Sequence, residues 1–416
     1  MGQWEQFDQT GHVSRRGRAG DGLLAEEVKE NMRLIQENGR SPLTTTIHAA
    51  GLALAAILLS SSGSNAWVTI SSPSNDSLVT GSVAVKASVA NDWWAQLVVD
   101  GNAVASGAPG NVSFTWNTTT VGDGAHWVTV KGYAKGSQSA DSAETVAVSV
   151  LNHVASDHSI RFGTLPESAP LPSGSWCAQV VPFETEMIPD NTTPDHTVPT
   201  AAQLTSYAAN GYNASPDNGI WAYARANGQY TGTTDMIIRW AACKWGIDED
   251  VIRAQTESEN WSWDQTIAHG DLRTSYSQCV NGGFTSLWNY KCTNCCYQTW
   301  SNWQTKVYYS WQTWPMMDTS TSFAADYRYA DQRACMNGDL ADYFAVKPSY
   351  NGHSYTADIA AGNLNTILWG CIGFHYSGEW YDGDTNSGAN SYINYVKNVL
   401  AARDWKTRWP SVNWTN

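Results

Sequence analysis

Residues 233–263 read TTDMIIRWAACKWGIDEDVIRAQTESENWSW and predict two helices joined by a tight break. Thr233 or Thr234 can cap the first helix, because a hydroxyl oxygen accepts hydrogen bonds from free backbone N–H groups. Gly246 can take the left-handed conformation that a helix exit requires. Asp248 then caps the second helix. This helical pair organises our interpretation of the C-terminal half.

The second helix carries two glutamates that a helical wheel places on different faces. At about 100° per residue, Glu259 shares the apolar face with Ile252 and Gln255, whereas Glu257 falls on the polar face. We therefore expect Glu257 in water and Glu259 turned toward the protein, where burial raises a carboxyl pKa. An acid that stays protonated near neutral pH can protonate a glycosidic oxygen. Helix geometry leaves open the alternative of an inward Glu with a structural partner.

The run AACKWGIDEDVIRAQTESEN (241–260) resembles the catalytic helix of the lysozyme-like soluble lytic transglycosylases. That family has Lys-aromatic-Gly-Val-Asp followed by an apolar helix leading to Glu-Ser, and residues 244–248 match its first part. Counting from Gly246 places the family's catalytic glutamate on Glu259, although the Glu-Ser pair itself occurs two residues earlier, at Glu257 and Ser258. Asn260 stands where the family has Ser, and we expect it to bind substrate through hydrogen bonds.

The resemblance covers roughly residues 231–405 and implies a turn that lines the sugar cleft with a Gln. The segment 275–278 (SYSQ) competes for this role with 299–306 (TWSNWQTK), which matches a longer form of the family's turn. We place the substrate-binding amide at Gln304, with Trp300 or Trp303 as a wall on which a sugar stacks. The alternative is a surface Gln beside an ordinary core Trp.

A second segment implied by the resemblance is HYSG (375–378), which is similar to a Tyr-Asn-x-Gly segment of the family. There a Tyr hydroxyl contacts the catalytic Glu, and Tyr376 is the match. His375 is the rival, which we expect to be structural. Residues 318–338 and 364–374 predict further helices. A closing helix presents an apolar stripe that we expect to serve packing only: Tyr392, Tyr395, Val396, Val399 and Leu400.

Length, composition and charge limit the number of domains and the kinds of partner that the protein can have. The chain has 416 residues, enough for two or three domains, and its net charge of −14 argues against nucleic acid and anionic membranes as partners. Its 22 Trp and 19 Tyr suit sugar-binding clefts, and they equally suit small irregular cores. The predicted chemistry requires no cofactor or metal, and we expect a monomer.

All 8 cysteines lie at or after Cys177, at positions 177, 243, 279, 292, 295, 296, 335 and 371. An even number confined to this part of the chain predicts up to four disulfides in an exported domain. The cluster CTNCC could instead bind zinc, but no Cys/His pair with finger-like spacing accompanies it.

The N-terminal residues 1–66 predict a tail followed by a leader. Residues 47–59 are apolar but too short for a comfortable membrane span, and 64–66 resemble a cleavage site. A start at Met32 would give an ordinary signal peptide near 44–66. An uncleaved membrane anchor is the alternative. Either predicts a secreted or envelope-associated protein.

Residues 67–152 contain short alternating runs separated by turn signals, which predicts an all-β sandwich. The segments VTISSP, LVVDGNAVA and GAHWVTVKGYA resemble bacterial Ig-like modules. We favour a spacer; the alternative is wall or glycan binding through Trp93 and Trp94. Residues 153–230, rich in Pro, Asn, Ser, Thr and Gly, predict a linker and an irregular approach to the last domain.

The fold class is therefore an Ig-like sandwich followed by a predominantly α, lysozyme-like domain at 231–416. The resemblance implies cleavage of peptidoglycan by one general acid/base, Glu259, with a 1,6-anhydromuramyl product. Ordinary glycosidases need a second carboxylate, and Asp264 and Asp271 are unmarked candidates. The alternatives are a muramidase or chitinase-like hydrolase that uses Asp271 to activate water, and an inactive wall-binding protein.

Overall fold

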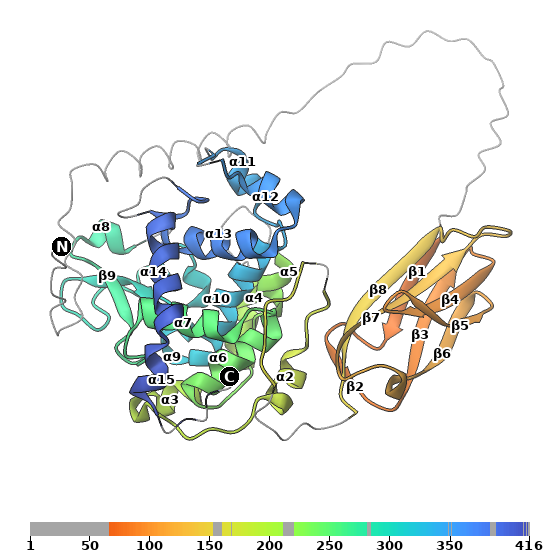
Figure 1. Cartoon of the computed structure of the whole chain (residues 1–416), viewed down its shortest axis with the longest axis horizontal. Helices are drawn as coiled ribbons and strands as arrows, with labels where there is room; N and C mark the ends of the chain where they lie inside the picture. Colours follow the sequence, from red (N-terminus) through yellow and green to blue (C-terminus); the bar gives the residue numbers. More distant parts are fainter. Residues whose placement is uncertain are drawn as a thin grey trace, which may run out of the picture. The chain divides into compact units, whose positions relative to one another are not determined.

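The computed structural model describes residues 66–152, 160–167, 169–210, 220–280, 284–347, 349–350, 352–382, 388–410, 412 and 414. A β-sandwich is followed along the chain by a largely helical region (Figure 1). The predicted leader lies outside the described residues, apart from Ala66. Within the described part of the chain, no helix has both the length and the apolar character needed to span a membrane.

Two sheets form the sandwich. The first has the order β1-β3-β6, with β1 (Trp67–Ser72), β3 (Ser82–Ala90) and β6 (Gly110–Asn117) all antiparallel. The second has the order β2-β8-β7-β4-β5: β2 (Ser77–Val79), β8 (Ser142–Val150), β7 (Gly124–Tyr133), β4 (Trp94–Val99) and β5 (Asn102–Gly107). Alternation of burial, as in Val85, Ala87 and Val89 of β3, confirms the predicted pattern.

The predicted helical pair is present as α6 (Thr234–Trp245) and α7 (Glu249–Glu259). The Thr233 side chain accepts a hydrogen bond from the N–H of Met236, and Gly246 leaves α6 at φ 58°. Asp248 accepts hydrogen bonds from two backbone N–H groups in the first turn of α7. The capping signals therefore set both helix boundaries, as the sequence predicts.

The helical region is built around α10 (Thr321–Met336), which is buried along nearly its whole length and packs against α5, α6, α9 and α13. The other helices are α2 (Gly174–Val180), α3 (Thr192–Asp195), α4 (Ala201–Ala209), α5 (Ile220–Arg225), α8 (Tyr276–Cys279), α9 (Met316–Thr319), α11 (Ala341–Ala345), α12 (Tyr355–Ala361), α13 (Leu364–Ser377), α14 (Ala389–Ala402) and α15 (Asp404–Arg408). The three helices predicted after residue 318 are confirmed as α10, α13 and α14.

A small antiparallel sheet follows α7 in the chain, with the order β11-β10-β9. Its strands are β9 (His269–Arg273), β10 (Cys296–Trp300) and β11 (Thr305–Lys306). The segment between β9 and β10 holds Cys279, Cys292 and Cys295, and Cys296 begins β10. Figure 1 shows α7 beside α6 and α14, and residue contacts join both pairs.

Four disulfides pair all the cysteines, as predicted: Cys177–Cys243, Cys279–Cys296, Cys292–Cys295 and Cys335–Cys371. The first joins α2 to α6, and the last joins α10 to α13. The CTNCC cluster is therefore used in disulfides rather than as a zinc site. Among the residues that the structure describes, no group of three His, Cys, Asp or Glu side chains is placed to hold a metal ion.

Candidate functional site

Glu259 is the last residue of α7, and only 14% of its side chain is exposed. Tyr392 of α14 donates its hydroxyl hydrogen to Oε1 of Glu259. His375 of α13 lies beside the same oxygen, with its Nε2 3.9 Å away. Three helices thus converge on one partly buried carboxyl group, which remains in reach of solvent.

The phenol of Tyr392 and the imidazole of His375 are both electrically neutral. Burial, together with the negative charge of Glu259, raises the pKa of Tyr392 well above its usual value, so the phenol keeps its proton. Burial and the nearby charge of Arg328 hold the pKa of His375 well below its usual value. Nε2 of His375 lies 3.0 Å from the carbonyl oxygen of Trp303, so Nε2 carries the ring hydrogen and donates it. The carboxyl therefore has a hydroxyl and a neutral imidazole beside it.

The expectation that Glu257 faces water is wrong. Its exposed fraction is 3%, and its carboxylate lies 2.7 Å from Nη2 of Arg408 on α15. Burial raises the pKa of Glu257, and the charge of Arg408 only partly offsets that rise. The helical wheel considered α7 alone, whereas α15 covers this face. Glu257 is thus held in an ion pair.

The predicted stacking wall is also wrong. Trp300 has an exposed fraction of 0% and Trp303 one of 1%, so neither can cover the face of a sugar. Trp300 packs against Trp314, with ring centroids 5.1 Å apart. Trp303 packs against Tyr329 of α10 and supplies the carbonyl that His375 binds. The alternative of ordinary core tryptophans is the one that the structure supports.

Gln304 lies in the turn between β10 and β11, where its amide is engaged locally. Oε1 accepts a hydrogen bond from Thr299 Oγ1 at 2.8 Å, and Nε2 donates one to the Ser301 carbonyl at 3.2 Å. Gly270 on β9 permits this arrangement, because a Cβ there would lie 2.6 Å from Gln304 Oε1. The amide that was predicted to bind substrate holds the turn instead.

Asn260 and Tyr376 lie next to Glu259 in the structure, but their contacts differ from those predicted. Asn260 ends α7, and its Nδ2 donates to Asn302 Oδ1 at 2.7 Å and to the Asp264 carbonyl at 3.0 Å. Tyr376 stacks on Tyr392, with centroids 4.8 Å apart and planes 6° from parallel. The tyrosine hydroxyl that reaches the glutamate belongs to Tyr392, which the sequence assigned to packing only.

The two candidates for a second carboxylate have local partners. Asp264 Oδ1 accepts hydrogen bonds from Thr266, from its N at 2.9 Å and from its Oγ1 at 2.6 Å. Asp271 pairs with Lys306 at 3.3 Å, and its side chain is 32% exposed. Asp271 also has a φ of 52°, an uncommon conformation for a residue with a side chain. Asp271 is the more available of the two.

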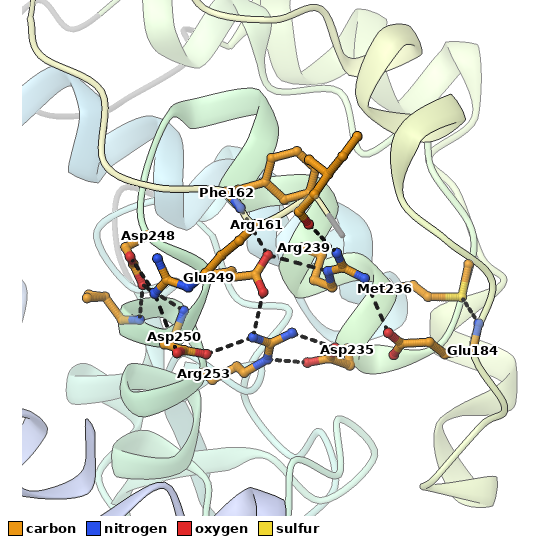
Figure 2. Close-up of polar contacts among 12 residues, drawn as sticks. Arg161, Phe162, Glu184, Asp235, Met236, Arg239, Asp248, Glu249, Asp250 and Arg253 are labelled. Atoms are coloured by element: carbon orange, nitrogen blue, oxygen red, sulfur yellow. Dashed lines mark hydrogen bonds and ion pairs between the residues drawn. The ribbon is translucent and has the colours of Figure 1, made fainter. Parts of the chain in front are cut away.

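A network of buried charges fixes the beginning of α7 (Figure 2). Arg253 binds both carboxylate oxygens of Asp235 on α6, with N···O distances of 2.7 and 2.8 Å. It also binds Glu249 at 3.0 Å and Asp250 at 2.8 Å. The exposed fraction of Arg253 is 1%. Charge-assisted and bidentate hydrogen bonds of this kind fix side-chain geometry.

The network extends beyond the two helices. Arg239 of α6 lies 3.4 Å from Glu249 and 3.4 Å from Glu184, and Figure 2 shows it between those two carboxylates. Arg403, just after α14, binds Asp250 at 2.9 Å. The helix that carries Glu259 is therefore tied both to α6 and to the end of the helix that carries Tyr392.

One comparison with known protein families bears on the sandwich. Residues 67–130 match the family model of the Bacterial Ig domain. The fibronectin(III)-like modules of Clostridium thermocellum CbhA are 19% identical, over 20% of this chain and 94% of that chain, with a TM-score of 0.16. The endo-beta-1,4-mannanase from Thermotoga petrophila is 15% identical, over 37% of this chain and 30% of that chain, with a TM-score of 0.18. No curated protein matches the chain. The comparisons thus find similarity to bacterial Ig domains at residues 67–130.

Proposed function

We propose that residues 231–416 form a lysozyme-like lytic transglycosylase domain that cleaves β-1,4 glycosidic bonds in peptidoglycan. The observation that carries this proposal is the setting of Glu259. Its carboxyl is partly buried, receives a hydrogen bond from Tyr392 and lies beside a neutral His375. A partly buried carboxyl group that can still reach solvent and accepts a phenol hydrogen bond can exchange its proton with a substrate oxygen.

The proposed reaction uses one carboxyl group twice. Glu259 gives its proton to the bridging oxygen while the bond from that oxygen to C1 of the muramyl unit breaks. The N-acetyl group of the sugar stabilises the positive charge that develops at C1. Glu259, now a carboxylate that accepts the Tyr392 hydrogen bond, takes the proton of the 6-hydroxyl as its oxygen bonds to C1. The product is a 1,6-anhydromuramyl end, and no cofactor is needed.

Hydrolysis is the alternative that a specific observation favours. Asp271 is partly exposed and holds an uncommon backbone conformation, which occurs more often at functional sites. If Asp271 activated water, the same cleavage would leave reducing ends.

Digestion of purified sacculi with the full chain, followed by mass spectrometry of the muropeptides, tests the proposal. Anhydro ends support transglycosylation, and reducing ends indicate hydrolysis. Binding without any cleaved product would indicate a wall-binding protein that has lost activity. The Glu259→Gln variant serves as the inactive control in each digestion.

We also propose that the protein is exported to the cell surface or envelope. The four disulfides support this location, because such bonds persist in oxidising compartments. In this proposal the sandwich is a spacer. A fragment covering 153–416 should then retain turnover on short soluble glycans.

A further inference from the structure

Trp261 is a highly exposed aromatic residue close to the candidate acid. It follows Glu259 by two residues, and 66% of its surface is exposed. Two residues of chain span at most about 7 Å, so the two backbones are near one another. Burying apolar surface contributes about 25 cal/mol per Å². At Trp261 this free energy of burial is mostly not obtained, although tryptophan has one of the largest side chains.

The indole of Trp261 is nevertheless held in place. The guanidinium carbon of Arg408 lies 3.7 Å from the Trp261 ring centroid and 4.9 Å from that of Trp409. Nη1 of Arg408 donates to the Trp261 carbonyl, and Nη2 pairs with Glu257 at 2.7 Å. Trp261 is thus exposed, and its ring is held in place by Arg408. The guanidinium of Arg408 is itself fixed by its contacts with Glu257 and the Trp261 carbonyl. An aromatic ring that is already fixed loses little entropy when it binds a ligand.

Two other exposed aromatic rings lie on α13 and α14, the helices that contact the Glu259 carboxyl group. Tyr395, one turn after Tyr392 on α14, is 47% exposed. Burial raises the pKa of Tyr395, and the charges of Glu257 and Glu259 raise it further. Tyr376, stacked on Tyr392, is 38% exposed. We call Trp261, Tyr376 and Tyr395 the aromatic rim.

We propose that Trp261 is the stacking platform for a pyranose ring next to the bond that Glu259 cleaves, and that the rest of the aromatic rim continues this binding surface. The inference rests on the proposed function. Aromatic rings offer a broad apolar face, which matches the C–H face of a sugar while its hydroxyl groups stay in water. Arg408 is committed to Glu257 and to the Trp261 carbonyl, so the platform selects the sugar ring by shape rather than an acidic group by charge.

The test measures binding without turnover. The full chain carrying Glu259→Gln is titrated by calorimetry with a soluble β-1,4-linked N-acetylglucosamine oligomer. Adding Trp261→Ala should weaken binding roughly ten-fold, equivalent to about 1.4 kcal/mol. Trp261→Phe should lose less, because it keeps a ring. Arg408→Lys, which keeps the charge beside Glu257 but removes the flat guanidinium, should also lose less.

Trp221→Ala is the matched control, since Trp221 is 40% exposed on α5 and its indole N–H binds Asp339. It should leave the dissociation constant unchanged. Equal weakening by Trp221→Ala and Trp261→Ala, or no binding by the parent, overturns the platform. A third outcome is possible, in which binding depends on Trp261 but the wild-type protein yields no cleaved glycan. That outcome overturns the proposed function and supports Trp261 as a sugar-binding platform.

Discussion

The carboxylates at the two ends of α7 make different kinds of contact. At the beginning, Glu249 and Asp250 are buried among arginines, and Arg253 contacts both. At the end, Glu259 has a phenol and a neutral imidazole as neighbours. The first setting pairs the carboxylates with cations and anchors the helix. In the second, the phenol of Tyr392 donates a hydrogen bond to a carboxyl group that we propose to act as the acid.

Glu257 sharpens this contrast because it lies only two residues from Glu259. It is the more buried of the two, yet a cation pairs with it. Burial alone therefore does not distinguish the catalytic candidate. The contacts differ in that Arg408 pairs with Glu257, whereas Tyr392 donates a hydrogen bond to Glu259.

The largest effect is expected from Glu259→Gln. The amide keeps the shape of the side chain but cannot donate the same proton, so activity on sacculi should fall about 100- to 10,000-fold. Circular dichroism and the melting temperature should show a folded protein. Muropeptide release over time measures the loss.

Glu257→Gln is the companion experiment. It removes the charge that faces Arg408, so the free energy of unfolding should fall by about 1–3 kcal/mol, while the folded fraction stays active. Urea unfolding and activity at low temperature separate the two quantities. An inactive Glu257→Gln beside an active Glu259→Gln would reverse our assignment.

Arg253→Met breaks the anchored end of the helix. It leaves the buried carboxylates of Asp235 and Glu249 without their main cation, which should cost about 3–5 kcal/mol in the free energy of unfolding. Urea titration measures this loss in the free energy of unfolding. Arg161→Met is the control: Arg161 is 34% exposed and pairs with Asp248, so its loss should cost less than about 1 kcal/mol. Equal losses would show that the network does not anchor α7.

Tyr392→Phe tests the other end with a smaller change. It keeps the ring that stacks on Tyr376 but removes the hydrogen bond to Glu259. A hydrogen bond to a charged group contributes about 1.5–3 kcal/mol, so turnover should fall about 10- to 100-fold with a small change in KM. Tyr309→Phe, at a 59% exposed residue after β11, should leave turnover unchanged. Wild-type turnover in Tyr392→Phe would remove Tyr392 from the mechanism.

The pH dependence of stability should reveal the buried carboxyl group of Glu184. Burial, reinforced by the charge of Asp235 and partly offset by Arg239, raises the pKa of Glu184 from 4.5 to about 8. The folded state then binds the proton more tightly than the unfolded state, so this contribution is complete below pH 4.5 and is lost as the pH rises through about 8. Glu184→Gln, which is always neutral, should flatten the decline in melting temperature over this range. An unchanged slope would contradict the assignment.

Local signals predicted the elements well. Caps at Thr233, Gly246 and Asp248 act within a few residues of the helix ends, so their effect can be read from the sequence. The alternating runs predict β1, β3, β4, β6, β7 and β8. They miss β2, which has three residues, and β5, which is rich in Asn, Ala, Ser and Gly.

The surroundings of the site could not be predicted in the same way. The partner of Glu257 lies 151 positions away, and the partner of Glu259 lies 133 positions away. No pattern inside α7 specifies either contact. Spacing alone likewise cannot separate a buried Trp300 from an exposed Trp261, because rings such as Tyr290 and Trp314, which lie elsewhere in the sequence, pack on Trp300.

The disulfide between Cys335 and Cys371 has a consequence for proteolysis. It encloses the segment that contains α11 and α12, where Val346 is 85% exposed. Exposed loop residues are the usual places where proteases cut a folded chain. A cut near Val346 would leave the piece bearing Glu259 covalently attached to the piece bearing Tyr392. The nicked protein would migrate as one species on a non-reducing gel and as two after reduction, and its site could remain assembled in a protease-rich environment.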